Sequence, residues 1–590
     1  MSFVIKSFFA TWAILRISNL HTMNVISVLF FVMSMVFFKK TNEKIKTIPQ
    51  DVYKKQSRLS MITAGVFTLF YMIGAANTIL SDMSNVLFRL VILAAVDIGL
   101  FSLFYNAILF GFAWFGSTDI FADKPMQEKT KKWLKRMPVI CFFACLLCWL
   151  PYFLYAFPAI MTPDSIRQLE QILGQRAFSN HHPWVHTMTM SLFYHFGSLF
   201  TDSVNGAFAF FTVFQMCFMA FAASFCVWIV SKFTQKMPVL IGITVFYACV
   251  PYNAVMSICI WKDVMFSGSV LIFCCALFYL LFGEKTKKMQ IGMTVIYVVT
   301  GILFCLYRSN GWYAFILCVP FLVFVFRKSW KVMLPLHVLI VAVVLLVKGP
   351  VMDACGVTQP DFVESVSMPL QMIGRVIAEG NELTAKQEAS LNKIMDVSAV
   401  PETYVGFFSD NMKNLVRDGN QEYLTEHKGE FFKVWLELGL KYPDTYLAAY
   451  INQTYGYFAP TAVYPVMDVE GIIDNEAGVY TTPLIRGVAV TKIREIFVKI
   501  YNVVPLYGIL SSMASLLWIT CLFMVYSVGI KKESFKEGLS KFILFLPNLA
   551  IIATLFLATP VANEFRYAYN LAYCLPLYVG VFIYFMKKTN

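Results

Sequence analysis

The segment LVILAAVDIGLFSLFYNAILFGFAWF, residues 90–115, decides the fold class of this chain. It carries one charged side chain, Asp97, and as an α-helix it would extend over about 39 Å, enough to cross the roughly 30 Å of hydrocarbon in a bilayer. Comparable apolar segments recur along nearly the whole sequence. We therefore predict an all-α integral membrane protein.

The overall composition supports this prediction. Of the 590 residues, 58% are hydrophobic and 14% are charged, which is more apolar than a soluble domain. The net charge of +13 does not indicate a nucleic-acid partner, because the Lys and Arg residues cluster between apolar segments and not on one face. Nearly all 14 cysteines fall inside apolar segments, so we predict neither a disulfide framework nor a cysteine metal site.

The charges between the apolar segments predict the topology. Apolar length and flanking charge indicate about thirteen transmembrane helices. The loops at 39–58 and 122–138 are rich in Lys and Arg, which the positive-inside rule places in the cytoplasm together with the C-terminus. For later basic loops to lie inside as well, residues 184–200 must not cross, so we expect a helix that lies on the outer membrane interface or dips back partway. We expect a multi-pass protein of the plasma membrane with its polar face outside.

The same pattern divides the chain into four parts. Residues 1–137 hold additional N-terminal transmembrane helices, and residues 138–347 form a transmembrane core with a polar first outer loop at 161–204. Residues 348–500 are less apolar and more acidic, which predicts a mostly helical extracellular domain with interfacial helices. Residues 501–590 return to apolar C-terminal transmembrane helices.

Four of the seven histidines lie close together in the first outer loop. They are His181, His182, His186 and His195. Histidines suit a membrane interface because they combine an apolar body with a polar tip. A zinc site is a second interpretation, since positions 182 and 186 share one helical face, but HPWVH lacks the glutamate of the HExxH motif. A shared site with Asp164 is the third.

Polar side chains border four predicted spans, and the predicted topology places all of them on the outer side. They are Asp164 with the histidines, Lys262 with Asp263, Arg308 with Asn310, and Glu564 with Arg566. Such charges are unfavourable beside apolar helices unless they pair or bind a ligand. A carboxylate can remove a proton from an acceptor hydroxyl while cations hold a departing phosphate. This combination fits group transfer from a lipid phosphate.

The order of these motifs resembles the GT-C superfamily of membrane glycosyltransferases, which use polyprenyl-phosphate-linked sugars on the outer or lumenal side. Asp164 in MTPDS and Pro183 in NHHPWVH look like the acidic residue and proline element of the first outer loop in those enzymes. Asp263 in IWKDVMF is similar in placement to their second acidic residue. From residue 142 onward the chain resembles a group of largely uncharacterised Gram-positive bacterial members.

The resemblance implies a GT-C-like fold and roles for individual residues. Asp164 would be the base of an inverting transfer, with His182 and Asp263 as further catalytic residues. Substrate and phosphate binding would fall to His181, His186, Lys262, Arg308, Asn310, Gln371, Arg375, Tyr455 and Arg566. No cofactor is assigned, but some family branches need Mg²⁺ or Mn²⁺, for which Asp164 and Asp263 are the candidate ligands.

The expected function is transfer of a sugar from a polyprenyl-phosphate donor to a lipid or cell-wall polymer acceptor in the cell envelope. One alternative is a ligase that moves a preassembled glycan or teichoic-type polymer from a lipid pyrophosphate, which shares the same chemistry. A lipid or glycan transporter is a second, disfavoured because the polar groups gather at one face and the sequence has no paired halves. A scaffold without catalysis predicts that Asp164→Asn is silent.

Overall fold

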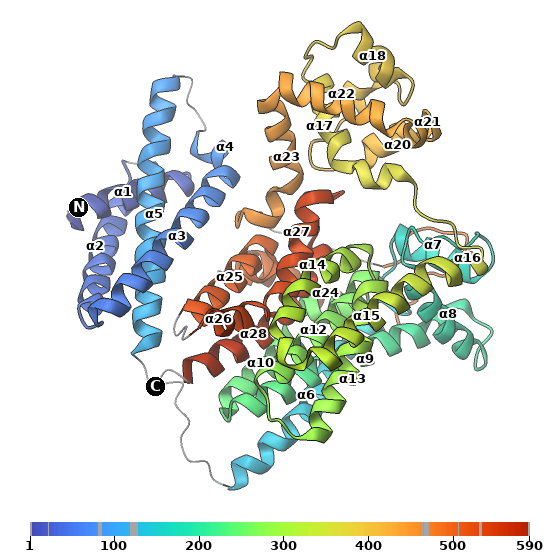
Figure 1. Ribbon diagram of the computed structural model, residues 1–590, viewed down its shortest axis with the longest axis horizontal. Helices are drawn as coiled ribbons and strands as arrows, with labels where there is room; N and C mark the ends of the chain where they lie inside the picture. Colours follow the sequence, from blue (N-terminus) through green and yellow to red (C-terminus); the bar gives the residue numbers. More distant parts are fainter. Residues whose placement is uncertain are drawn as a thin grey trace.

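The computed structural model describes residues 3–21, 23–80, 85–117, 128–462, 464, 471–504, 507–529 and 534–587. Within these ranges the chain forms helices joined by turns, with isolated β-bridges and no strand. The prediction of an all-α protein is thereby confirmed. Figure 1 shows an N-terminal bundle in blue, a central bundle, and a separate lobe in yellow and orange.

Eight helices of the described residues are long and apolar enough to cross a membrane, or ten if each of two bent pairs counts as one span. The eight are Gln50–Gly74, Val86–Gly116, Lys131–Tyr155, Val204–Phe233, Lys262–Phe282, Lys287–Leu306, Arg327–Ala354 and Phe565–Met586. The bent pairs are Met237–Cys249 with Pro251–Ile258 and Phe535–Phe542 with Leu546–Ala558. The protein is therefore a multi-pass membrane protein, while the total of thirteen spans stays a prediction.

The N-terminal bundle docks on the central bundle through aromatic side chains. It consists of α1 (Phe3–Ile17), α2 (Ile26–Ile45), α3 (Gln50–Gly74), α4 (Ala76–Ile79) and α5 (Val86–Gly116). The ring of Phe67 stacks on Trp518, with centroids 4.1 Å apart. Gly111 leaves room for the Tyr526 hydroxyl, which a Cβ at this position would overlap. These contacts hold the first five helices against the C-terminal ones.

The central bundle surrounds one helix, α12, which packs against α9, α13 and α28. Its members are α6 (Glu128–Tyr155), α9 (Val204–Phe233), α10 (Met237–Cys249), α11 (Pro251–Ile258), α12 (Lys262–Phe282), α13 (Lys287–Leu306), α14 (Ser309–Val325), η2 (Arg327–Ser329), α15 (Trp330–Leu346), η7 (Tyr507–Ser511), α25 (Met513–Gly529), α26 (Phe535–Phe542), α27 (Leu546–Ala558), η8 (Phe565–Ala568) and α28 (Tyr569–Lys587). Nearly every residue of α12 is buried, as expected for a helix that is apolar on all sides. The central position of α12 fixes where its first two residues, Lys262 and Asp263, can lie.

Two short helices, α7 (Pro163–Ile172) and α8 (Trp184–Ser198), cover one end of this bundle. A short parallel pairing aligns α7 with α12: the Ile160 amide donates to the Ile258 carbonyl, and the Ile260 amide donates to the Ile160 carbonyl, each at 3.0 Å. The start of α7 therefore lies beside the start of α12. Helix α8 exposes apolar side chains such as Leu192 and Phe196, and it is not among the candidate spans. Its position at the membrane interface stays a prediction.

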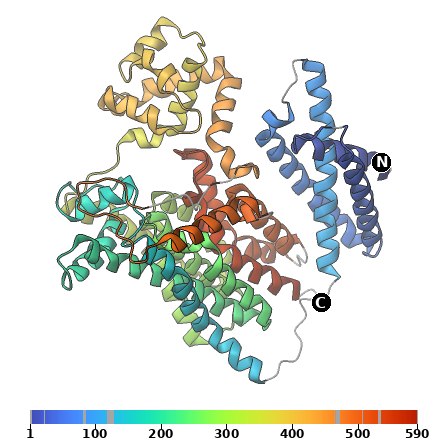
Figure 2. The ribbon, with the colours of Figure 1, turned by 180° about the vertical axis from the view of Figure 1, so that it is seen from behind.

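The lobe has a hydrophobic core of its own, built around Leu370, Ile373 and Met412. It follows η3 (Val347–Val351) and α16 (Met352–Ala354) and contains η4 (Phe362–Val366), α17 (Ser367–Ala378), α18 (Ala385–Asn392), η5 (Val397–Ala399), α19 (Val400–Thr403), α20 (Asp410–Asp418), α21 (Gln421–Glu426), α22 (Lys428–Lys441) and α23 (Pro443–Phe458). Figures 1 and 2 show α23 descending from the lobe to the central bundle, where it packs on α25 and α27.

The lobe is shorter than the outer domain predicted for residues 348–500. After α23 the chain leaves it, and the Leu484 amide donates to the carbonyl of Leu154 in α6 across 2.8 Å. In α24 (Val488–Val503), the guanidinium of Arg494 lies 5.7 Å from the ring centroid of Tyr155. Residues 480–484 therefore contact the end of α6 and the start of α9, outside the lobe.

Candidate active site

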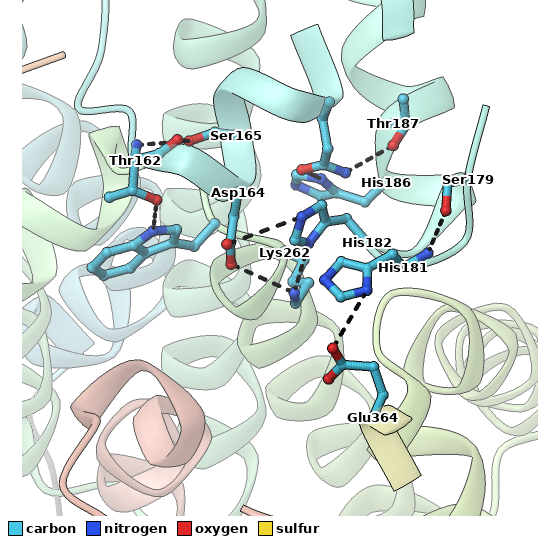
Figure 3. Close-up of polar contacts among 12 residues, drawn as sticks. Thr162, Asp164, Ser165, Ser179, His181, His182, His186, Thr187, Lys262 and Glu364 are labelled. Carbon is cyan, nitrogen blue, oxygen red and sulfur yellow. Dashed lines mark hydrogen bonds and ion pairs between the residues drawn. The ribbon is translucent and has the colours of Figure 1, made fainter. Parts of the chain in front are cut away.

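Asp164 lies in the first turn of α7, beside the start of α12. The Thr162 amide donates to Ser165 Oγ across 2.9 Å and closes this turn. The indole N–H of Trp261 donates to Thr162 Oγ1, also at 2.9 Å (Figure 3). Because Trp261 directly precedes α12, this bond ties the two helix starts together. The Asp164 side chain keeps 29% of its surface exposed.

Two cations share one oxygen of Asp164. Arg566 Nη1 donates to Oδ2 across 3.0 Å, and Lys262 Nζ lies 3.7 Å from the same atom. His182 Nε2 is 4.0 Å from the other oxygen, Oδ1. Burial by itself would raise the pKa of Asp164, but Lys262, Arg566 and His182 together hold it well below its ordinary value. The carboxyl is therefore ionised at any physiological pH.

The tautomer of His182 follows from its contact with Lys262. Lys262 Nζ lies 3.1 Å from His182 Nδ1; an ammonium group can only donate, so Nδ1 is the acceptor and the ring proton resides on Nε2. That N–H faces Asp164, as Figure 3 shows. Burial and then the charge of Lys262 lower the pKa of His182 well below its ordinary value, so the ring is neutral.

His186 connects α8 to α7. Its Nδ1 lies 3.2 Å from Gln168 Oε1, and Gln168 Nε2 donates to Thr187 Oγ1 across 2.8 Å. Since the amide nitrogen is the donor to Thr187, the Gln168 oxygen accepts and His186 Nδ1 carries the proton. The ring is fully buried, and burial followed by the charge of Lys262 lowers its pKa to about 3.

Asp263 and Arg308 form a buried ion pair. Arg308 Nη1 is 2.9 Å from Asp263 Oδ1 and donates to the backbone carbonyl of Tyr567 across 2.9 Å. Its guanidinium also lies 4.7 Å from the centroid of the Tyr567 ring. Asp263 is completely buried. The pair therefore anchors η8, and with it the segment that carries Arg566, to the start of α12.

Arg566 holds a second carboxylate, that of Glu564. Arg566 Nε lies 3.5 Å from Glu564 Oε1, and the Arg566 guanidinium stacks 4.8 Å from the centroid of the Trp261 ring. Burial raises the pKa of Glu564 above its ordinary value, although Arg566 and a hydrogen bond from Tyr464 act in the opposite direction. The sequence placed Glu564 at the outer boundary of a span, but no motif there indicated a role for it.

His181 connects the charged cluster of Asp164, Lys262 and Arg566 to the lobe. Its Nδ1 lies 3.9 Å from Glu364 Oε1 in η4 (Figure 3), and Glu364 accepts from Lys413 Nζ across 2.8 Å and from Arg417. Sequence reasoning missed Glu364, because nothing in the pattern of η4 indicates a contact with a loop so distant in the chain. The preceding backbone supports this contact, since the Asn180 amide donates to the Thr358 carbonyl at 2.8 Å.

Four other predicted site residues are not brought to Asp164. Gln371 is buried at the base of the lobe and donates to Gln453 Oε1 across 2.9 Å, while Arg375 pairs with Glu379 at 2.8 Å. Asn310 and Tyr455 are half-buried on α14 and α23. Among the described residues, none of these four forms a hydrogen bond or ion pair with the cluster.

The two aspartates predicted as metal ligands do not fit a divalent cation in this arrangement. Asp164 is held by Lys262 and Arg566, and Asp263 by Arg308, so a cation bound to either would meet an existing positive charge. Across the described ranges, no group of three or more His, Cys, Asp or Glu residues is placed to hold a metal ion.

An apolar cavity of about 480 Å³ has Ile160, which precedes Asp164 by four residues, in its wall. It is enclosed by α6, α11, α24 and residues 471–485, and its walls include Ile160 and Ile258. Ile160 and Ile258 are joined by the backbone bond that aligns α7 with α12. The cavity is thus connected through Ile160 and Ile258 to the backbone pairing that precedes α7 and α12.

Comparison with known proteins finds a family match that covers the cations of this cluster, while Asp164 precedes the matched range. No curated protein and no solved structure matches the chain. One family model matches residues 173–589, more than two thirds of the chain, and this range includes Lys262, Asp263, Arg308, Glu564 and Arg566. The chain therefore belongs to the family of unknown function DUF6020.

Proposed function

We propose that this protein is a GT-C-type membrane glycosyltransferase that moves a sugar from a polyprenyl-phosphate donor to a cell-envelope acceptor on the outer face of the plasma membrane. The observation that carries the proposal is the cluster of Asp164, Lys262 and Arg566, which joins a carboxylate to two cations. An apolar cavity has Ile160, four residues before Asp164, in its wall. A lipid phosphate needs both features.

Lys262 and Arg566 have N–H groups that could donate hydrogen bonds to a phosphate. Lys262 carries three N–H groups, of which one is directed at His182, and Arg566 carries five. Arg566 Nε is buried without a hydrogen-bond partner. Charge-assisted bonds from such groups neutralise the phosphate as the bond to the sugar breaks. Arg308 is already paired with Asp263, so its contribution is to position Arg566.

The cavity suits the hydrocarbon chain of such a donor. Its walls are mainly apolar, among them Tyr152, Val255 and Ile493, so an isoprenoid chain could pass from the bilayer into it without exposing apolar surface to water. A carboxylate of the cluster would then remove the proton from the acceptor hydroxyl. Asp164 and Glu564 are the two candidates for that base.

The test is release of polyprenyl phosphate by the purified protein in detergent, supplied with a panel of radiolabelled polyprenyl-phosphate sugars. We expect release by the wild type and a loss of at least about 100-fold in Asp164→Asn, because the two cations lose their shared anchor. The matched control is Glu170→Gln, which removes another α7 carboxylate whose partner, Arg176, lies outside the cluster. Glu170→Gln should turn over like wild type.

Three results would redirect or overturn the proposal. Release only from a polymer carried on a lipid pyrophosphate would indicate that the same site belongs to a polymer ligase. No release from any donor, with labelled polyprenyl phosphate still bound, would favour lipid transport. Equal release by wild type and Asp164→Asn would remove the cluster from the reaction.

A further inference from the structure

Asp164 is already occupied by cations, which is unfavourable for a general base. Its Oδ2 accepts from Arg566 at 3.0 Å and lies 3.7 Å from Lys262, while Oδ1 faces the N–H of His182. An acceptor hydroxyl that used either oxygen would compete with these donors. The lowered pKa of Asp164 also makes it a weak base, and general-base catalysis becomes less efficient as the pKa of the base falls below the working pH.

Glu564 has the opposite surroundings although it shares the same arginine. It lies 3.5 Å from a different nitrogen of Arg566, Nε, and its Oε1 is buried without a hydrogen-bond partner. Its side chain as a whole is 15% exposed. The partially satisfied carboxylate is the one that can accept a new hydrogen bond.

The groups that face Glu564 come from several elements. Arg566 and the hydroxyl of Tyr464 touch it, and the charges of Asp263 on α12 and Asp164 on α7 act on it. Tyr457 of α23 and Cys259 before α12 are also close enough to interact electrostatically with Glu564. Burial and the two aspartates favour the protonated form of Glu564, whereas Arg566 and Tyr464 favour the carboxylate. Asp164 and Glu564 share the guanidinium of Arg566 but differ in proton affinity. Such a difference between neighbouring carboxyl groups is typical of sites where the two groups have different acid–base roles.

We propose that Glu564 is the general base for the acceptor hydroxyl, and that Asp164 instead anchors Lys262 and Arg566 at the departing phosphate. This inference rests on the proposed function. The acceptor oxygen forms a bond to the anomeric carbon of the sugar, and the bond from that carbon to the phosphate oxygen breaks. The electron pair leaves with polyprenyl phosphate, and the hydroxyl proton passes to Glu564, which later returns it to water.

A purely structural Glu564, which only orients Arg566, is the competing interpretation. The two roles differ in pH dependence and in donor binding. A base must be deprotonated to act, so wild-type turnover should decline on the acid side as Glu564 takes up its proton. Asp164, with its lowered pKa, would give no such decline until far more acidic conditions.

The experiment compares wild type, Glu564→Gln, Glu564→Asp and Asp164→Asn, with Glu170→Gln as control. Release of polyprenyl phosphate is followed from about pH 5 to about pH 9, and binding of labelled polyprenyl phosphate is measured in parallel. We expect Glu564→Gln to lose at least about 100-fold in turnover with binding retained. Glu564→Asp should recover part of the rate with the acid limb displaced, and Asp164→Asn should lose binding as well as turnover.

The contrary outcomes are separable. An active wild type with an equally active Glu564→Gln would overturn the assignment of the base and leave the proposed function standing. Loss of binding in Glu564→Gln to the extent seen in Asp164→Asn would assign Glu564 the structural role. A wild type that releases nothing from any donor would overturn the proposed function, and the base with it.

Discussion

Lys262 Nζ donates to His182 Nδ1 across 3.1 Å, and this bond orients both side chains toward Asp164. Without it, the ammonium group would be free to rotate on its four-carbon chain, and the histidine proton could move to the other ring nitrogen. The histidine is buried, so water cannot replace it easily as an acceptor.

This relationship leads to a prediction for His182. His182→Ala removes an acceptor of a charged donor, a loss of roughly 1.5–3 kcal/mol or about 10- to 100-fold in turnover. His182→Asn should keep more activity, because its side-chain oxygen can stand near the position of Nδ1. Steady-state release of polyprenyl phosphate measures both, and thermal unfolding shows whether each variant folds. Equal rates for the two variants would mean that the bond to Lys262 is not used.

His186 predicts a pH dependence of stability. Its pKa is about 3 in the folded protein and about 6.5 when unfolded, so the unfolded chain binds the extra proton between these values. Stability from this group is complete above about pH 6.5 and falls as the pH decreases toward about 3, by up to about 1.4 kcal/mol per pH unit.

The variant His186→Asn tests this linkage. Its amide N–H can replace Nδ1–H as donor to Gln168, but the side chain does not titrate. We expect the melting temperature of the wild type to decrease on acidification more steeply than that of His186→Asn. His195→Asn, an exposed position on the same helix, should follow the wild-type curve. Parallel curves for wild type and His186→Asn would contradict the prediction.

The sequence predicts the membrane class well and the site only in part. Apolar length identifies helices such as α5 and α12 because hydrocarbon selects for length and composition, which are local properties. Charges at span ends also pointed to Asp164, Lys262 and Arg566, which the structure brings into contact. That outcome depended on a shared side of the membrane, which the basic loops indicate.

What the sequence could not supply is the partner of each charge. Asp263 and Lys262 are neighbours in the chain, yet Asp263 pairs with Arg308 while Lys262 turns to His182. Consecutive residues of a helix point in different directions, so each side chain finds its partner on another element. Gln371 and Arg375 likewise lie in a motif that suggested a site but make their contacts within the lobe and at its base.

The ion pair of Asp263 and Arg308 gives the last prediction. Both side chains are buried, and removing one partner leaves the other charge without compensation in a medium of low polarity. Asp263→Asn should therefore destabilise the protein by about 3–5 kcal/mol. Replacing both charges in Asp263→Leu/Arg308→Met should restore much of that loss, because no buried charge remains.

Thermal unfolding in detergent measures the stability of wild type and of both variants. The double variant should turn over slowly even when it is stable, because position 308 no longer donates to the Tyr567 carbonyl and Arg566 shifts as a result. If Asp263→Asn were as stable as wild type but inactive, Asp263 would act in the reaction itself and not as the anchor of the segment that carries Arg566.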